Sequence, residues 1–153
     1  MTAIVAIDPG LSGAWGAIDH NGKYLGCGDM HHEGKIIQTN KVWDEIKAAT
    51  AGYDIEFCIE QVSARPGQGV VSSFTFGGAY MAAIAITQRS YHPTTMVTPQ
   101  KWKKAMGLTS DKNLSLDMAR ELWPEAPLKR KKDKDRAEAL LIAEFFRREM
   151  YDK

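Results

Sequence analysis

A continuous apolar run near the start of the chain constrains the fold more than any other feature of the sequence. Residues 3–8 read Ala-Ile-Val-Ala-Ile-Asp, and Pro9 and Gly10 follow directly. A run this short, ended by turn-forming residues, predicts a central β-strand that is buried on both faces. Such a strand needs other strands beside it and helices above and below it, which indicates an α/β fold.

The same kinds of signal predict the other strands and helices. Residues 13–18 and 23–30 are expected to form two strands, joined by a hairpin turn at Asn21 and Gly22. The remaining expected elements are a helix over 39–51, a strand over 55–60, a loop over 63–76, a helix over 77–89, a strand over 92–97, and helices over 99–105, 111–123 and 135–150. We therefore expect one domain over residues 1–153, a mixed five-stranded sheet flanked by helices.

Composition excludes several classes of protein. The 153 residues are 44% hydrophobic and 25% charged, which suits a globular domain with a core of its own. Two cysteines, Cys27 and Cys58, supply neither a disulfide framework nor a zinc module. No stretch approaches the roughly 18 apolar residues of a membrane span, and the start lacks the basic region of a signal peptide. We expect a soluble cytoplasmic protein with no membrane partner.

The net charge of +1 conceals a basic block in the second half of the chain. Residues 99–136 carry 11 Lys and Arg against 6 Asp and Glu, whereas residues 1–98 carry 6 against 9. A block of this kind is typical of a surface that binds a polyanion, although a solvated charged face gives the same pattern.

Carboxylates stand at the ends of two expected strands and at the start of the last helix. Asp8 ends the first strand and Glu60 ends the fourth, so the two converge at one edge of the sheet if those strands are neighbours. Asp135 and Glu138 are spaced i, i+3 in the first turn of the last helix and share one face. Asp133 is an alternative to Asp135 in this group of carboxylates, but only Asp135 has the i, i+3 spacing to Glu138.

Four carboxylates without matching His or Cys ligands suit a hard cation such as Mg²⁺ or Mn²⁺. Each of them alone reads equally well as a cap or a solvated charge. Glu60 fits that plain interpretation least, because it closes a strand whose other face is formed by Ile55, Phe57 and Ile59.

The ordered set of motifs resembles the RuvC-type Holliday-junction resolvases, particularly their short phage-encoded members. The resemblance rests on Asp8 in Ile-Val-Ala-Ile-Asp-Pro-Gly-Leu-Ser-Gly, Glu60 in Ile-Glu-Gln-Val, Asp135 and Glu138 in Asp-Arg-Ala-Glu-Ala-Leu-Leu-Ile-Ala, and the segments 98–104 and 107–112. It implies a ribonuclease-H-like fold and a homodimer that nicks two strands of a DNA four-way junction. A phage-encoded member would act in the cytoplasm of a bacterial host.

The resemblance implies that Asp8, Glu60, Asp135 and Glu138 form a catalytic tetrad that binds two Mg²⁺ ions, with Mn²⁺ as a substitute. Two such ions would activate a water and stabilise the departing 3′ oxygen, leaving a 5′-phosphate and a 3′-hydroxyl. The cellular enzymes usually have Asp where this chain has Glu138. They often have an aromatic wedge where this chain has Ser63, which leaves Phe74 or Phe76 as substitute wedges.

The resemblance also gives the basic residues a place. Lys112, and one lysine of the segment 101–104, lie near positions where the family has lysines at the rim of the active site. The run from Lys129 to Lys132 precedes the last helix and would hold a second duplex arm. The expected DNA contacts are Arg65, Phe74, Phe76, Lys101, Lys103, Lys104, Lys112, Lys129, Arg130, Lys131 and Lys132.

Two further groups of apolar residues have both a structural and a functional interpretation. The helix over 77–89 is apolar on almost every side, so it is expected to be buried on more than one side, in the core or against a partner. It also matches the region where the family dimerises. The four tryptophans, Trp15, Trp43, Trp102 and Trp123, are expected to be core anchors rather than platforms for base stacking.

Three other functions remain open from the sequence. Residues 7–13 also resemble the phosphate-binding hairpin of actin-like ATPases, although those proteins need two such domains around a nucleotide. The same nuclease fold could serve a broader enzyme that cuts flaps and Y-forks as well as four-way junctions. A DNA-binding relative without catalysis is the third alternative, and the presence of all four carboxylates argues against it.

Overall fold

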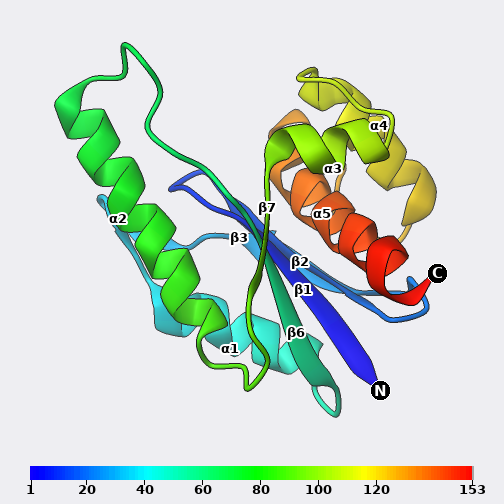
Figure 1. Ribbon diagram of the computed structural model, residues 1–153. Helices are drawn as coiled ribbons and strands as arrows, with labels where there is room; N and C mark the ends of the chain where they lie inside the picture. The colour runs from blue at the N-terminus through cyan, green and yellow to red at the C-terminus, as the bar shows by residue number, and fades with distance from the viewer. Residues whose placement is uncertain (153) are drawn as a thin grey trace.

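A mixed five-stranded sheet runs through the middle of the protein in the computed structural model, which describes residues 1–152 (Figure 1). Its strands, in the spatial order β3-β2-β1-β6-β7, are β1 (Thr2–Asp8), β2 (Ala14–Asp19), β3 (Tyr24–Asp29), β6 (Asp54–Glu60) and β7 (Thr95–Val97). β1 pairs antiparallel with β2 and parallel with β6, and β6 pairs parallel with β7. The predicted five-stranded mixed sheet flanked by helices is confirmed.

Helices cover both faces of this sheet (Figure 1). One face packs against α1 (Thr39–Ala49) and α2 (Val70–Thr87), and the other packs against α3 (Pro99–Ala105), α4 (Lys112–Leu122) and α5 (Lys134–Tyr151). A single 3₁₀ turn, η1 (Lys131–Asp133), leads directly into α5.

The central strand is buried on both faces, as the apolar run predicts. Ile4 and Ala6 belong to the hydrophobic cluster under α4 and α5, whereas Val5 and Ile7 belong to the cluster under α1 and α2. Side chains alternate between the two faces of a strand, so one continuous apolar run supplies both halves of the core.

Close contact between α5 and the sheet fixes the position of the last helix. A Cβ atom at Gly16 of β2 would lie 2.8 Å from the backbone nitrogen of Leu140, so only glycine leaves room for α5 here. Residues 137–143 of α5 are buried without interruption. The start of this helix is therefore held rigidly over the ends of the central strands.

The sequence prediction was wrong in three places. The loop expected over residues 63–76 ends at Gly69, because α2 begins at Val70. At the start of this helix, Gln68 Nε2 donates to Ser72 Oγ at 3.2 Å. The strand expected over 92–97 is only three residues long. A small hairpin, β4 (His32–Glu33) and β5 (Ile36–Ile37), was not predicted, since two-residue strands carry no periodicity.

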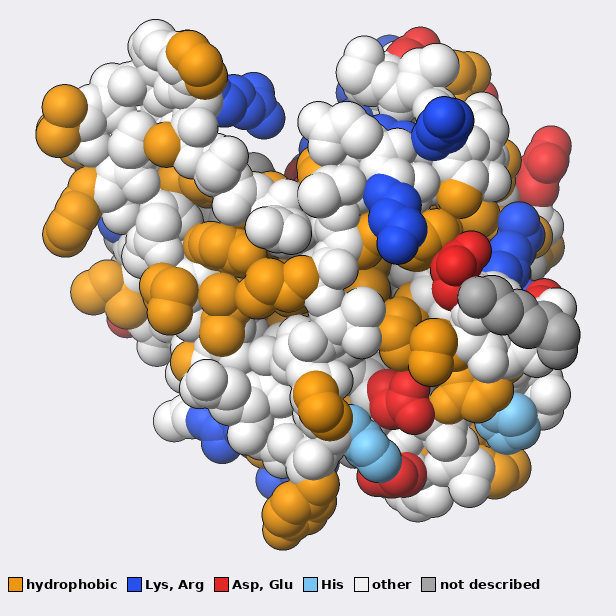
Figure 2. Space-filling view, in the orientation of Figure 1, with side chains coloured by type: hydrophobic (Ala, Val, Ile, Leu, Met, Phe, Trp, Pro, Cys, Tyr) orange, Lys and Arg blue, Asp and Glu red, His pale blue; other side chains and the backbone are white. Residues whose placement is uncertain are grey.

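Helix α2 departs most from expectation. Its buried residues are Ala79, Ala83, Ile86 and Thr87, so the chain itself buries the helix along one side and not along several. By length and composition alone, its 18 residues would suffice to cross a membrane, contrary to the expectation that no such stretch exists. The outward side is strongly apolar, and Figure 2 shows hydrophobic side chains gathered where α2 lies in Figure 1.

Candidate active site

Asp8 and Glu60 lie at the carboxyl ends of neighbouring parallel strands. Ile7 of β1 is in register with Ile59 of β6, so the next residue along each strand is one of the two acids. Both side chains are largely removed from solvent, with residue exposures of 8% and 7%. The predicted convergence of these two carboxylates at one sheet edge is confirmed.

The start of α5 adds two more carboxylates to this edge. The charges of Glu60, Asp135 and Glu138 all act on Asp8, so the structure brings together the four acids that the motifs single out. Glu138 is 2% exposed, whereas Asp135 stands one turn earlier and is partly exposed.

Burial and mutual repulsion disfavour the charged forms of these carboxylates. Burial, followed by the charges of Glu60, Asp135 and Glu138, raises the pKa of Asp8 well above its ordinary value. Burial likewise raises the pKa of Glu60, although the Trp102 indole partly opposes this rise. Asp8 Oδ2 is buried and has no hydrogen-bond partner. An unpartnered oxygen beside three other acids is a strong acceptor for a cation.

Two lysines supply part of the missing charge. Lys112 Nζ lies 2.7 Å from Asp135 Oδ1 and 3.5 Å from Glu138 Oε1, and Lys103 Nζ lies 3.4 Å from Glu138 Oε2. Burial disfavours the ammonium of Lys112, but its hydrogen bond to Asp135 and the surrounding acids outweigh this and raise its pKa above its ordinary value. The ammonium therefore stays charged at neutral pH.

Two neutral donors contact the carboxylates, and the sequence did not assign either of them to the site. Trp102 Nε1 donates to Glu60 Oε2 at 2.7 Å, and Ser115 Oγ donates to Glu138 Oε2 at 3.0 Å. Trp102 is fully buried, which confirms it as a core anchor, and a buried indole N–H needs an acceptor. The spacing of Ser115 from Lys112, i, i+3 on α4, was a signal that could have placed both on the same helix face.

Asp133 has a structural function instead. Its carboxylate accepts hydrogen bonds from the Arg130 backbone nitrogen at 2.8 Å and from Arg130 Nη2 at 2.7 Å, which caps η1. Asp135 is the acid of this segment whose charge acts on Asp8. The geometry therefore favours Asp135 as the third member of the cluster.

The residues suit a hard divalent cation in their chemistry. Every donor is a carboxylate oxygen, and one of those oxygens is buried without a partner. Within residues 1–152, however, no three His, Cys, Asp or Glu side chains are arranged to hold a single ion. The ammonium groups of Lys103 and Lys112 contact Asp135 and Glu138, and a bound cation would take over this neutralising function.

The residues predicted to contact DNA fall into different places. Lys103 and Lys112 reach the carboxylates, whereas Lys101 and Lys104 are exposed. Arg65 and Phe76 line a cavity of about 510 Å³ together with Gln61, which follows Glu60 directly. Phe74 is 85% exposed.

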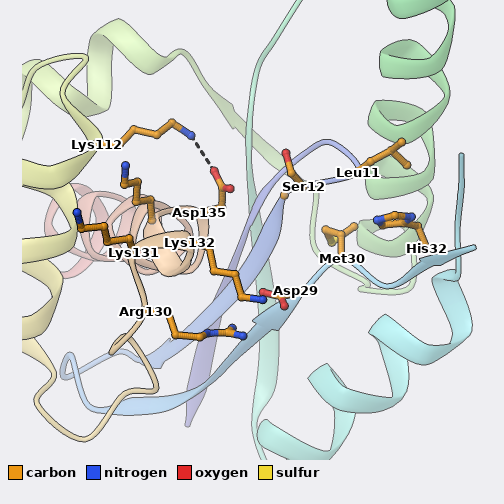
Figure 3. Close-up of a pocket in the computed structure, with 12 residues that line it drawn as sticks. Leu11, Ser12, Asp29, Met30, His32, Lys112, Arg130, Lys131, Lys132 and Asp135 are labelled. Atoms are coloured by element: carbon orange, nitrogen blue, oxygen red, sulfur yellow. Dashed lines mark hydrogen bonds and ion pairs between the residues drawn. The ribbon is translucent and has the colours of Figure 1, made fainter. Parts of the chain in front are cut away.

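The basic run before α5 lies beside the carboxylates and divides between two cavities. Arg130, Lys131 and Lys132 line a cavity of about 470 Å³ that also includes Asp135 and Lys112 (Figure 3). Lys129 lines a separate cavity of about 770 Å³ near Pro124. Arg130 lines both cavities.

Comparisons with known proteins support the fold. No protein-family model matches the sequence, and no curated protein matches it. Among solved structures, the chain is similar to Thermus thermophilus RuvC in complex with a Holliday junction substrate, with 16% identity, a TM-score of 0.65 and coverage of 97% and 96% of the two chains. A second Thermus thermophilus RuvC structure has 18% identity, a TM-score of 0.57 and coverage of 97% of each chain. At such low identity this likeness confirms the ribonuclease-H-like fold expected from the motifs; a phage-like subtype stays a prediction.

Proposed function

We propose that this protein is a metal-dependent, structure-selective DNA endonuclease that resolves four-way junctions by nicking two strands. The observation that carries the proposal is the cluster of Asp8, Glu60, Asp135 and Glu138 at one sheet edge, with a buried oxygen that lacks a partner. The fold is similar to RuvC, which has been solved with a Holliday junction substrate. The basic surfaces beside the cluster suit a phosphodiester substrate.

The four carboxylates would hold two divalent ions, Mg²⁺ or Mn²⁺. Such ions, when bound, activate a water and stabilise the departing 3′ oxygen, so that the products carry a 5′-phosphate and a 3′-hydroxyl. Trp102 and Ser115 orient Glu60 and Glu138 by donating hydrogen bonds at 2.7 and 3.0 Å.

The two lysines beside the acids differ in exposure and therefore in function. Lys112 has a side chain that is 43% exposed, so its ammonium can turn from Asp135 toward a phosphate at the mouth of the site. Lys103 is held more tightly, with a side chain that is 17% exposed and an ammonium 5.4 Å from the centre of the Trp102 ring. Lys103 therefore positions Glu138, while Lys112 is the mobile phosphate contact.

Phe76 is better placed than Phe74 to act on the branch point. Phe76 lines the cavity that begins at Gln61, and it also lines a second cavity of about 620 Å³ beside Pro9 and Gly10. These cavities adjoin the chain directly after Glu60 and directly after Asp8. Phe74 lies on the outward side of α2 instead.

A second copy of the chain would complete the enzyme, because paired nicks need two sites. On α2, Val70, Phe74, Met81 and Ala85 are exposed at helical spacing. Gly77 and Gly78 lie between them with open space beside them, which allows another helix to approach closely. An apolar stripe of this kind is costly to leave in water. We propose that α2 packs against α2 of the second copy.

The direct test is cleavage of a labelled synthetic four-way junction with Mg²⁺ or Mn²⁺, alongside linear duplex, a Y-fork and the variant Asp8→Asn. We expect paired symmetric nicks in the junction, and loss of cleavage with retained binding in the variant. Junction binding without any cleavage would indicate a DNA-binding protein without catalysis. Failure to bind or cut would overturn the proposal and favour the nucleotide-binding alternative.

A broader branched-DNA endonuclease is the second candidate function. Ser63 is small and exposed where an aromatic wedge would favour one branched structure over another. Equal cutting of the Y-fork and the four-way junction in the same assay would support this broader activity.

A further inference from the structure

A pocket beside the carboxylate cluster has two chemically different walls. It has a volume of about 470 Å³, and Asp135 and Lys112 form part of its rim. Figure 3 shows Lys112 and Lys131 on one side of the pocket, Leu11, Met30 and His32 on the other, and Lys132 extending between them toward Asp29. One wall is cationic, and the other contains Leu11, Ser12 and His32 and has no lysine or arginine.

The cationic wall has charge to spare. Its two acids are already engaged, because Asp29 pairs with Arg136 at 2.7 Å and Asp135 pairs with Lys112 at 2.7 Å. Arg130 is held by Asp133. The remaining cations of this wall are Lys131, Lys132 and Lys134. None of the three has an ion-pair partner among residues 1–152. Three unpaired ammonium groups at one pocket suit the phosphates of a nucleic acid strand.

The opposite wall suits the flat face of a base. Leu11 is half-buried, and it packs against the core cluster that contains the buried Met30. His32 Nδ1 donates to the backbone oxygen of Gly34 at 2.9 Å, which fixes the orientation of an exposed imidazole ring. Apolar and ring side chains of this kind stack on nucleic acid bases with little dependence on their identity.

We propose that this pocket binds one unpaired deoxynucleotide of the strand being cut, with its phosphate on the lysines and its base against Leu11 and His32. This inference rests on the proposed function, and it assigns a binding position to an unpaired nucleotide at the branch. The volume falls within the range of about 300–1,000 Å³ that is typical of sites for small molecules. A paired base inside a duplex cannot reach an apolar wall, whereas an unpaired base at a branch can.

The test combines a variant of the wall with removal of one base from the DNA. Junctions are prepared with a single abasic site at each position next to the branch, and their affinities are measured by fluorescence anisotropy in EDTA, which prevents cutting. For the wild type, we expect one position at which base loss weakens binding roughly 5- to 100-fold. His32→Ala should weaken binding of the intact junction similarly and remove the further effect of the abasic site. Leu11→Ser should behave in the same way, and circular dichroism checks that both variants are folded.

The cationic wall is tested by the salt dependence of binding to the same junction. The triple variant Lys131→Gln, Lys132→Gln, Lys134→Gln should lower the slope of log affinity against log salt by about two to three. The matched control is Lys23→Gln, Lys41→Gln, Lys47→Gln, which removes the same charge from other exposed positions and should leave the slope nearly unchanged.

The outcomes separate this inference from the proposed function. If the wild type binds no branched DNA, both are overturned. If the wild type binds and cuts the junction but base loss costs the same in wild type and His32→Ala, only the pocket assignment is overturned. An unchanged salt slope in the lysine variant also overturns it. Free thymidine monophosphate at millimolar concentration should not displace the junction, and displacement would assign the pocket to a free nucleotide instead.

Discussion

Helices α2 and α5 are equally long and are used in opposite ways. Each has 18 residues, but α5 buries ten consecutive residues from Ala137 to Phe146, whereas α2 buries four. The buried helix carries eight charged residues, and the exposed helix carries none. The apolar content of a helix therefore does not by itself predict its burial in this protein.

The difference lies in what each helix has to pack against and in how its charges are paired. α5 lies across β1, β2 and α4, and its buried acids have partners: Glu144 pairs with Arg147 at 2.8 Å and with Arg148 at 2.9 Å. α2 meets the sheet mainly through Ala79, Ala83 and Ile86 in its second half. Buried charge on α5 can serve chemistry, while unburied apolar surface on α2 can serve association.

The two buried glutamates of α5 give the sharpest test of this division. Glu138→Gln should lower the cleavage rate by about 10²–10³-fold or more, because it removes a negative charge from the site at nearly constant shape. Glu144→Gln on the same helix should retain cleavage but lose about 1–3 kcal/mol of unfolding free energy, since hydrogen bonds to two arginines are weakened. Junction cleavage and urea unfolding measure the two effects. Equal loss of cleavage in both variants would contradict a functional difference between the glutamates.

The next test concerns the outward side of α2. Phe74→Glu combined with Met81→Glu should weaken the proposed dimer by about 100-fold or more, because charges would replace two central apolar contacts. The fold should change by no more than about 0.5 kcal/mol, since both side chains are exposed in the single chain. Sedimentation velocity measures the oligomeric state. The matched control, Leu122→Glu combined with Met150→Glu, changes exposed apolar residues elsewhere and should leave the dimer intact.

The sequence predicted the parts of the structure that local patterns determine. The apolar run before Asp8 identified the central strand, and the positions of Asp8 and Glu60 at strand ends predicted their convergence. Partnerships across long distances were not predictable: Trp102 lies 42 residues from Glu60, and Ser115 lies 23 residues from Glu138. Nor can a local pattern tell whether an apolar helix will be covered by its own chain, which is why α2 was expected to be more buried.

A smaller effect concerns the stability cost of the carboxylate cluster. Because the pKa of Asp8 is raised in the fold, its contribution to stability is complete below its unfolded pKa and is lost as pH rises through the higher folded pKa. Metal-free wild type should therefore lose stability as pH rises above about 4, and Asp8→Asn should be more stable than wild type at pH 7. Thermal unfolding in EDTA across pH measures this difference.

The control for that experiment is a buried acid at the other end of the same sheet. Asp19 is 6% exposed and accepts hydrogen bonds from the backbone nitrogens of Asn21 and Lys23. Its Oδ1 holds the hairpin turn by accepting both hydrogen bonds, so Asp19→Asn should not stabilise the protein. An equal gain from both substitutions would show that repulsion within the cluster is not the cause.

The smallest effect expected comes from the indole that supports the cluster from α3. Trp102→Phe removes the N–H donated to Glu60 together with part of the buried ring system, and it keeps an aromatic ring in the core. Glu60 then loses its neutral donor, and its carboxylate is free to turn, which should lower the cleavage rate by about 10-fold. The metal concentration needed for half-maximal cleavage should rise as well, and calorimetric titration with Ca²⁺ measures ion binding without cutting.

Trp123→Phe is the matched control, because the indole of Trp123 donates to the Gly22 oxygen far from the acids. If both variants lower cleavage and ion binding equally, Trp102 acts through packing and not through Glu60.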